Sequence, residues 1–107
     1  MSNLTEKKCV PCEGGVPSLD SAEVETLLGE ISGWSLDGKW ITKEFKFKNF
    51  VEAMKYVNKA AELAEEQGHH PDIHIHYNRV RFDIWTHAIN GLSENDFILA
   101  AKLDALR

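Results

Sequence analysis

The stretch DIHIHYNRVRFDIWTH, residues 72–87, alternates apolar and polar side chains on either side of a polar Asn-Arg pair. Strict alternation is typical of a β-strand with one buried face, and two such runs joined by a short polar link indicate an antiparallel hairpin. With residues 78–79 as a two-residue turn, facing residues have numbers that sum to 157, so Ile75 faces Phe82. This register puts the aliphatic side chains of both strands on one face of the sheet.

A second hairpin is predicted on the N-terminal side of this stretch. The Asp-Gly pair at 37–38 tolerates the two positive φ angles that a type I′ turn requires. It joins strands at 34–36 and 39–47 and pairs Trp34 with Ile41. The chain is therefore expected to contain four strands in two hairpins.

Three segments carry a helix start signal, which is a capping residue followed by an acidic residue three positions later. They are Asp20 with Glu23, Asn49 with Glu52, and Ser93 with Asp96. The first helix is predicted through Ile31 with Gly33 as its stop, and the second to about Gln67 with Gly68 as its left-handed cap. Helices and strand pairs then alternate, which predicts an α+β fold: a four-stranded antiparallel sheet with three helices on one face.

The long helix at 49–67 carries two apolar stripes. The stripe expected to face the core comprises Phe50, Met54, Val57, Ala61 and Ala64, and the second comprises Ala53, Tyr56, Ala60 and Leu63. The second stripe has two interpretations, a wider contact with the core or packing against a second copy of the chain. A homodimer or homotetramer is the form of assembly that the second interpretation predicts.

Length and composition limit the classes of function. The 107 residues predict one domain at 18–107 after an irregular segment at 1–17. A net charge of −5 argues against nucleic-acid binding by bulk electrostatics, and no apolar run approaches the roughly 18 residues of a membrane span. Two cysteines cannot form a disulfide framework and no targeting segment is evident, so a cytoplasmic protein is expected.

Histidine is the residue type that indicates chemistry. Extending the register of the hairpin one step places His70 opposite His87, and His69 is adjacent in sequence at the end of the long helix. Imidazole exchanges protons readily near neutral pH, so three converging rings suit general acid–base catalysis. A satisfied polar structure is the alternative interpretation. Glu65, in the last turn of the helix, is placed to hold one imidazole in a single tautomer.

Other polar motifs have weaker functional interpretations. His74 and His76 share a strand face, as in some zinc sites, but Asp83 and Arg81 are predicted to face them and a structural role is favoured. Cys9-x-x-Cys12 is a lone pair, typical of a tail, and no metal site is predicted from it. Asp96 caps the last helix, and the loop before that helix could also bring its carboxylate to the histidine cluster.

The spaced pattern of these residues resembles the pterin-4a-carbinolamine dehydratase family. The pattern comprises Glu65-x3-His69-His70-Pro71, then Tyr77, His87 and Asp96, together with Gly91-Leu92-Ser93-Glu94 and the aromatic segment 45–50. The resemblance covers about residues 20–106 and implies dehydration of a 4a-hydroxytetrahydropterin to quinonoid dihydropterin, with no metal or organic cofactor. It also implies a pterin as the small-molecule partner and a homotetramer; animal members in addition act as dimerisation cofactors for a transcription factor.

The resemblance assigns roles residue by residue. It implies that His69, His70 and His87 are catalytic, with His70 the main acid–base residue. It also implies a supporting or substrate-binding role for four further residues: Glu65, Pro71, Thr86 and Asp96. Asn95 stands where some members have arginine, and Ile73 where some have an aromatic residue. Trp85 or Trp40, on the opposite sheet face, could replace that aromatic residue as a stacking surface.

Overall fold

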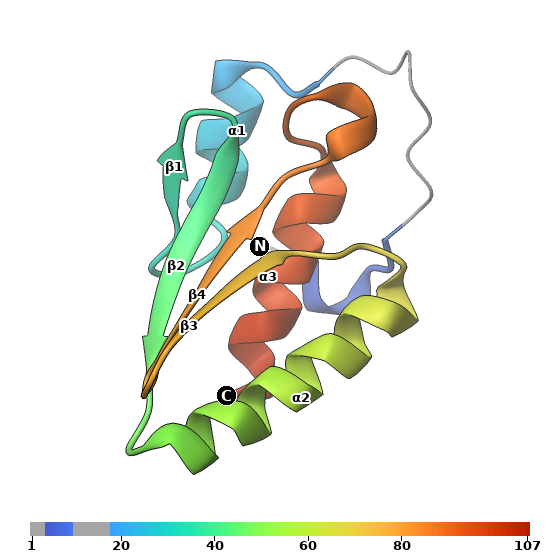
Figure 1. The fold of residues 1–107 in the computed structure, drawn as a ribbon. Coiled ribbons are helices and arrows are strands. Elements are labelled where there is room, and N and C mark those ends of the chain that lie inside the picture. Colours follow the sequence, from blue (N-terminus) through green and yellow to red (C-terminus); the bar gives the residue numbers. More distant parts are fainter. Residues whose placement is uncertain (1–3, 10–17) are drawn as a thin grey trace.

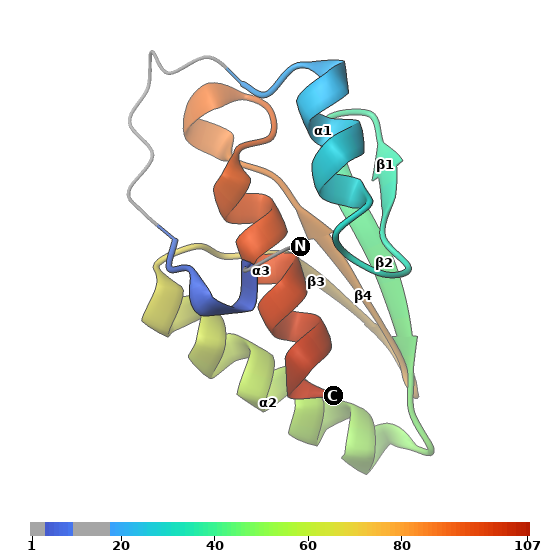
Figure 2. The ribbon, with the colours of Figure 1, turned by 180° about the vertical axis from the view of Figure 1, so that it is seen from behind.

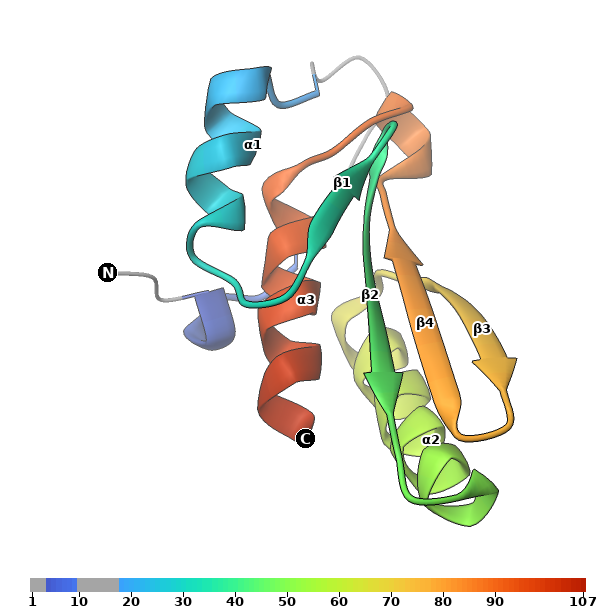
Figure 3. The ribbon, with the colours of Figure 1, turned by 90° about the vertical axis from the view of Figure 1, so that its left-hand side faces the viewer.

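The computed structural model describes residues 4–9 and 18–107. Its helices and strands are α1 (Ser21–Leu28), β1 (Ser35–Asp37), β2 (Trp40–Lys46), α2 (Phe50–Gln67), β3 (Asp72–His76), β4 (Arg79–Ile84) and α3 (Glu94–Leu106), with short 3-10 turns η1 (Leu4–Glu6) and η2 (His87–Ile89). The sheet is antiparallel throughout, in the order β1-β2-β4-β3. The three helices cover one of its faces, with α3 between α1 and α2 (Figures 1 and 3). The predicted α+β architecture is confirmed.

The core lies between this sheet face and α3. The sheet contributes five side chains that are no more than 1% exposed: Ile41, Phe45, Val80, Phe82 and Ile84. The opposite face is open, and Arg79 and Arg81 are exposed on it. Most of helix α3 is buried, because the sheet, the other two helices and η1 surround it (Figure 2).

The described part of the N-terminal segment, residues 4–9, packs on the domain. Leu4 is buried against the core in η1, which packs on α3. Lys102 donates a hydrogen bond to the Thr5 carbonyl oxygen at 2.9 Å, and the Cys9 backbone N–H donates to Gln67 Oε1 at 2.9 Å. Residues 4–9 are therefore held on the surface of the domain.

The helix start signals predict the observed N-termini. Asp20 and Glu23 form the reciprocal capping box of α1, and the Asn49 side chain accepts from the Glu52 backbone N–H at 3.0 Å. Gly68 ends α2 with a φ of +66°, as expected for a left-handed cap. The predicted end of α1 is wrong: the helix stops at Leu28 and the chain bends well before Gly33.

The predicted register of the second hairpin is wrong by one pair. Ile73, rather than Ile75, faces Phe82. The turn begins one residue earlier than expected, at Tyr77, which has a φ of +54°. Because the sum of paired residue numbers changes by two, every side chain keeps its predicted face.

The first hairpin contains the same kind of error. Leu36, rather than Trp34, faces Ile41, and the turn begins at Gly38. Gly38 has a φ of +66° whereas Lys39 does not lie in the left-handed region, a pattern found in type II′ turns rather than the type I′ turn expected.

The assignment of the two stripes on α2 is reversed in part. Ala53, Tyr56 and Ala60 of the second stripe are 0%, 5% and 0% exposed and face the core, whereas Phe50 of the expected core stripe is 47% exposed. Burial raises the pKa of the Tyr56 phenol, whose hydroxyl donates to the Leu103 carbonyl oxygen at 2.7 Å. The wider-core interpretation of this stripe is therefore correct.

None of the helices within the described ranges combines the length and apolar character that crossing a bilayer requires.

Candidate active site

A cavity of about 350 Å³ opens where α2 ends and β3 begins, beside the end of β4 and the start of η2. Its lining comprises Gly68, His69, His70, Pro71, Asp72, Trp85, Thr86, His87 and Ala88. All three predicted histidines therefore border one cavity. Its volume is within the range of about 300–1,000 Å³ typical of small-molecule sites.

The reason for this convergence differs from the one predicted. In the observed register Asp72 faces Asp83, so continuing the pairing for two further residues on each strand would set His70 beside Trp85 rather than beside His87. His87 reaches the cavity because β4 ends at Ile84 and the chain turns into η2. The left-handed Gly68 turns the chain away from α2 on the other side, which brings His69 and His70 to the same place.

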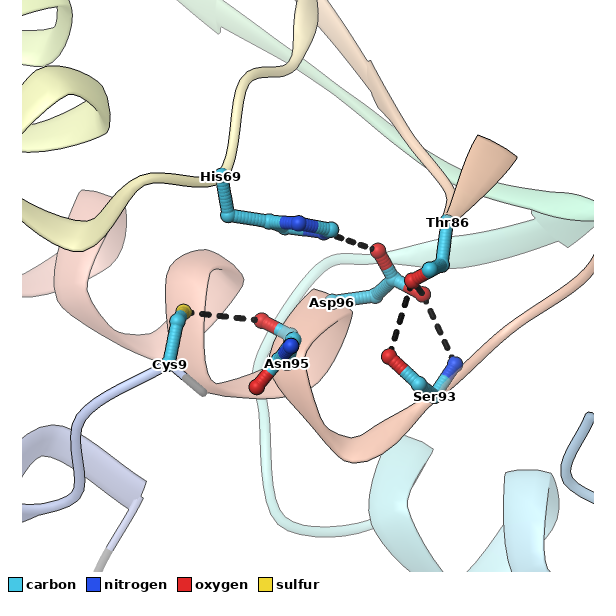
Figure 4. A network of polar contacts seen from close by, with 6 residues as sticks. All are labelled: Cys9, His69, Thr86, Ser93, Asn95 and Asp96. Carbon is cyan, nitrogen blue, oxygen red and sulfur yellow. Dashed lines mark hydrogen bonds and ion pairs between the residues drawn. The ribbon is translucent and has the colours of Figure 1, made fainter. Parts of the chain in front are cut away.

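His69 is fixed by a buried carboxylate. Its Nε2 lies 2.6 Å from Asp96 Oδ1, and the Asp96 side chain is completely buried (Figure 4). A carboxylate can only accept hydrogen bonds, so Nε2 carries a proton and, in the neutral ring, Nδ1 is left as the acceptor. Asp96 thereby determines the tautomer of His69.

Asp96 is itself held by two neighbours. Its Oδ2 accepts from the Thr86 hydroxyl at 2.9 Å and from the Ser93 backbone N–H at 2.8 Å (Figure 4). Because the Thr86 hydroxyl hydrogen is used in this way, the Ser93 hydroxyl donates to Thr86 Oγ1 at 2.8 Å. The two sequence interpretations of Asp96, helix cap and partner of a histidine, are therefore both correct.

His70 has a carboxylate partner of a different kind. Its Nε2 lies 2.5 Å from Glu65 Oε2, but the two side chains are 60% and 79% exposed. An exposed pair of this type contributes little to stability, typically about 0–1 kcal/mol. Its effect is on the orientation and tautomer of the imidazole, which is the role the sequence indicated for Glu65. Glu66 is exposed, as expected for a surface residue.

His87 stands on the first residue of η2 and is exposed. Its ring centroid lies 4.1 Å from that of Trp85, with the planes 42° apart. Within residues 4–9 and 18–107, no side chain or backbone group forms a hydrogen bond with its ring nitrogens. Both nitrogens are thus available to a ligand in the cavity.

The remaining predicted site residues fall into two groups, those that line the cavity and those that do not. Pro71 and Thr86 line the cavity, whereas Glu65 and Asp96 stand behind His70 and His69 and do not line it. We therefore describe Glu65 and Asp96 as positioning residues rather than as contacts for a substrate.

The other polar motifs lie apart from the cavity. His74 faces Arg81 in the register, yet its Nε2 lies 3.0 Å from Asp83 Oδ2, so a structural role fits it. His76 is exposed and faces Arg79, not Arg81 as predicted. Throughout the described ranges, no three His, Cys, Asp or Glu side chains are grouped so as to hold a metal ion.

The cysteine pair and the two sequence departures also lie elsewhere. The Cys9 thiol donates to the Asn95 carbonyl oxygen at 3.6 Å, and Cys12 is outside the described residues. Asn95 is 4% exposed and does not line the cavity. Ile73 packs against the core and does not line the cavity, so the residue type at this position does not alter the cavity lining.

Four lining residues were not among the predicted site residues: Gly68, Asp72, Trp85 and Ala88. Asp72 follows Pro71 directly and stands two residues after His70, a spacing that could have placed it in the cavity. Trp85 was one of two possible stacking residues, and it lines the cavity whereas Trp40 does not. Thr86 between them is extended, so Trp85 and His87 point to the same side.

The fold and the cavity define a small α+β protein with a histidine site suited to proton transfer. A model of the family described as pterin 4 alpha carbinolamine dehydratase matches residues 17–106. Relatives in Rubrobacter xylanophilus and Halorhodospira halophila, each named "putative pterin-4-alpha-carbinolamine dehydratase", are both 50% identical to this chain. The first alignment covers 99% of this chain and 100% of the relative, and the second covers 97% of each.

The chain is also similar to a solved structure of a protein with a related name. The crystal structure of a transcriptional coactivator/pterin dehydratase from Brucella melitensis superposes with a TM-score of 0.79 at 38% identity, covering 83% of this chain and 97% of that one. The chain belongs to the pterin 4 alpha carbinolamine dehydratase family.

Proposed function

We propose that this protein is a hydro-lyase that dehydrates a 4a-hydroxytetrahydropterin, such as 4a-hydroxytetrahydrobiopterin, to quinonoid dihydropterin and water. The observation that carries the proposal is the arrangement of His69, His70 and His87 around one cavity in a chain of this family. The reaction would need no metal and no organic cofactor, because loss of water changes no oxidation state and the C4a–O cleavage can be assisted by acid–base side chains alone.

The reaction requires two proton transfers: one to the hydroxyl that leaves C4a and one from N5. The C4a–O bond breaks as a general acid protonates the departing hydroxyl, and the N5 lone pair forms the C4a=N5 double bond. Loss of the N5 proton to a base completes the quinonoid product. Imidazole can fill either role near neutral pH, typically accelerating a step about 10²–10⁴-fold.

His70 is our assignment for the main acid–base residue. It borders the cavity, is 60% exposed, and is oriented through Nε2 by Glu65. His69 and His87 would serve the hydroxyl from other directions. His69 has the fixed tautomer that Asp96 gives it, and His87 has two uncommitted ring nitrogens within the described structure.

The first test is a stopped-flow absorbance assay with freshly generated carbinolamine. We expect purified protein to accelerate dehydration well above the spontaneous rate in the same buffer, in proportion to enzyme concentration. A rate equal to the spontaneous rate, with folded protein in excess, would show that the chain is not this enzyme.

We also propose that the chain forms a homodimer or homotetramer, through a surface that the sequence did not indicate. Exposed apolar side chains gather where α2 begins beside the β3–β4 turn: Phe50, Val51, Ile75 and Tyr77. Phe50 and Tyr77 stack with ring centroids 6.5 Å apart and planes at 11°. An exposed apolar cluster of this kind is typical of an interface.

Sedimentation velocity tests this surface. The Phe50→Glu/Val51→Glu variant is expected to sediment as a smaller species than the wild type, because two charges would be buried at the interface. Glu62→Lys, at an exposed position of the same helix, is the matched control and should leave the mass unchanged. An unchanged mass for the double variant would reject the surface as the self-association site.

The same surface is where a non-catalytic role would lie. The Brucella melitensis relative is named a transcriptional coactivator/pterin dehydratase. A different protein that binds such a coactivator is therefore the alternative occupant of this surface. We favour the homo-oligomer in a cytoplasmic enzyme, a setting consistent with the two cysteines of the sequence.

A further inference from the structure

His69 and His70 each have a carboxylate that sets the direction of the ring, whereas His87 has none in the described structure. An exposed imidazole without a partner would sample several rotamers, which is unfavourable for a group that must meet a reacting atom. The nearest feature that could restrict it is the indole of Trp85, 4.1 Å from it between ring centroids.

The local backbone places these two rings together. Thr86 is extended, with φ −105° and ψ 103°, so the residues on either side of it point away from the Thr86 side chain. Thr86 itself points inward to Asp96 and is 3% exposed. Residues 85–87 are therefore held by the bond between Thr86 and Asp96, with Trp85 and His87 on the side away from it.

Trp85 is in turn held from the tip of the first hairpin. Lys39 Nζ lies 5.0 Å from the centroid of its ring, and the Trp40 ring lies 6.2 Å away, tilted by 58°. A cation near an aromatic ring and a tilted ring pair are both favourable contacts. The indole is therefore restrained on the side of β2.

Lys39 also fixes the backbone that carries His87. Its Nζ donates to Asn90 Oδ1 at 2.7 Å. Asn90 ends η2 in the left-handed conformation, and its backbone N–H donates to the His87 carbonyl oxygen at 3.1 Å. The β1–β2 hairpin tip thus contacts both the indole beside His87 and the turn on which His87 stands.

We propose that Trp85 is the positioning residue of His87, and that Lys39 holds Trp85 in place. This inference rests on the proposed function for its kinetic consequence, but the contact itself does not. Misplacement of a catalytic group by about 1 Å can reduce a rate about 10²-fold. We expect Trp85→Ala to lower kcat about 10–100-fold with little change in KM.

The kinetic test is a double-mutant cycle of Trp85→Ala and His87→Ala. If Trp85 acts through His87, the double variant is no slower than His87→Ala alone. Trp85→Phe, which keeps an aromatic ring beside His87, should recover most of the activity. Effects that multiply in the double variant would overturn the proposal, as would a rise in KM with unchanged kcat, which would make Trp85 a stacking surface for substrate.

A proton NMR measurement tests the contact without reference to turnover. The ring current of Trp85 should displace the His87 Cε1–H resonance from its random-coil position, and Trp85→Ala should return it there. His87→Ala assigns the resonance, and the exposed His76 is the internal control. An undisplaced resonance in the wild type rejects the inference even if the enzyme is active, whereas a displaced resonance in a protein without turnover upholds the contact and rejects the function.

Discussion

Replacing Asp96 with asparagine is expected to lower the rate of dehydration about 10²–10⁴-fold while leaving the fold intact, because the change acts on the tautomer of His69. The amide oxygen can keep the bonds from Thr86 and Ser93, so the amide nitrogen takes the place of Oδ1. That nitrogen is a donor and faces His69 Nε2, which must then become an acceptor. The proton moves to Nδ1, so the ring presents a donor instead of an acceptor to the substrate.

Alanine at the same position separates the structural role from the catalytic one. Asp96→Ala would leave buried donors on Thr86 and Ser93 without their acceptor, at a cost of about 1–3 kcal/mol for an unsatisfied group. Urea unfolding should therefore show a clear loss of stability in Asp96→Ala and a much smaller one in Asp96→Asn. Turnover by Asp96→Asn within about twofold of the wild type would mean that the tautomer of His69 is irrelevant to the reaction.

His70→Ala is expected to lower kcat by a similar factor, about 10²–10⁴, because it removes the main acid–base group. The side chain is 60% exposed and, among residues 4–9 and 18–107, is bonded only to the exposed Glu65, so the free energy of unfolding should change by no more than about 0.5 kcal/mol. Stopped-flow single turnovers give the rate, and urea unfolding verifies the fold.

Two further variants make this result specific. His76→Ala removes an exposed histidine of the same hairpin that does not line the cavity, and it should retain wild-type activity. Glu65→Gln keeps the size of the partner but removes its charge, so it should have a smaller effect than His70→Ala. Equal activity in folded His70→Ala and His76→Ala would remove His70 from the mechanism.

Much of the fold could be predicted because its signals are local. Asp20 with Glu23, Asn49 and Gly68 act on backbone groups within four residues, so the sequence alone identifies where these helices begin or end. The end of α1 was missed because Ile31 continues the apolar spacing beyond the last helical residue, Leu28, although the chain has already left the helix.

Hairpin register is less accessible for a definite physical reason. A slip that changes the sum of paired numbers by two returns every side chain to the same face, so the apolar pattern is equally satisfied. Only the turn distinguishes the alternatives. Tyr77 with a positive φ is uncommon for a bulky residue, and nothing in the sequence favours it over the Asn-Arg pair as the start of the turn.

The buried face of α2 also depends on distant parts of the chain. Both stripes of this helix are apolar, so periodicity cannot say which one faces inward. The answer is set by α3 and the sheet, against which Ala53 and Ala60 pack with no exposed surface. Phe50 is left outside the core, which changes the expected self-association surface.

In the candidate site, too, some features could be predicted from local sequence spacing and others depend on distant parts of the chain. The convergence of His69, His70 and His87 was predicted from spacing and then found around one cavity. A role for Glu65 in holding one imidazole was also predicted, and the structure shows that this imidazole is His70. The Thr86–Asp96–Ser93 network and the contact between Trp85 and His87 were not predicted, because they depend on how η2 returns the chain to α3.

The most direct measurement is the single-turnover dehydration rate of the His70→Ala/His87→Ala variant, compared with the wild type and with buffer. Both side chains are exposed, so the variant should fold, and urea unfolding can verify this. If imidazoles around the cavity transfer the protons, the folded variant falls to near the spontaneous rate while the wild type remains far above it. A folded double variant that dehydrates the carbinolamine as fast as the wild type would contradict the account.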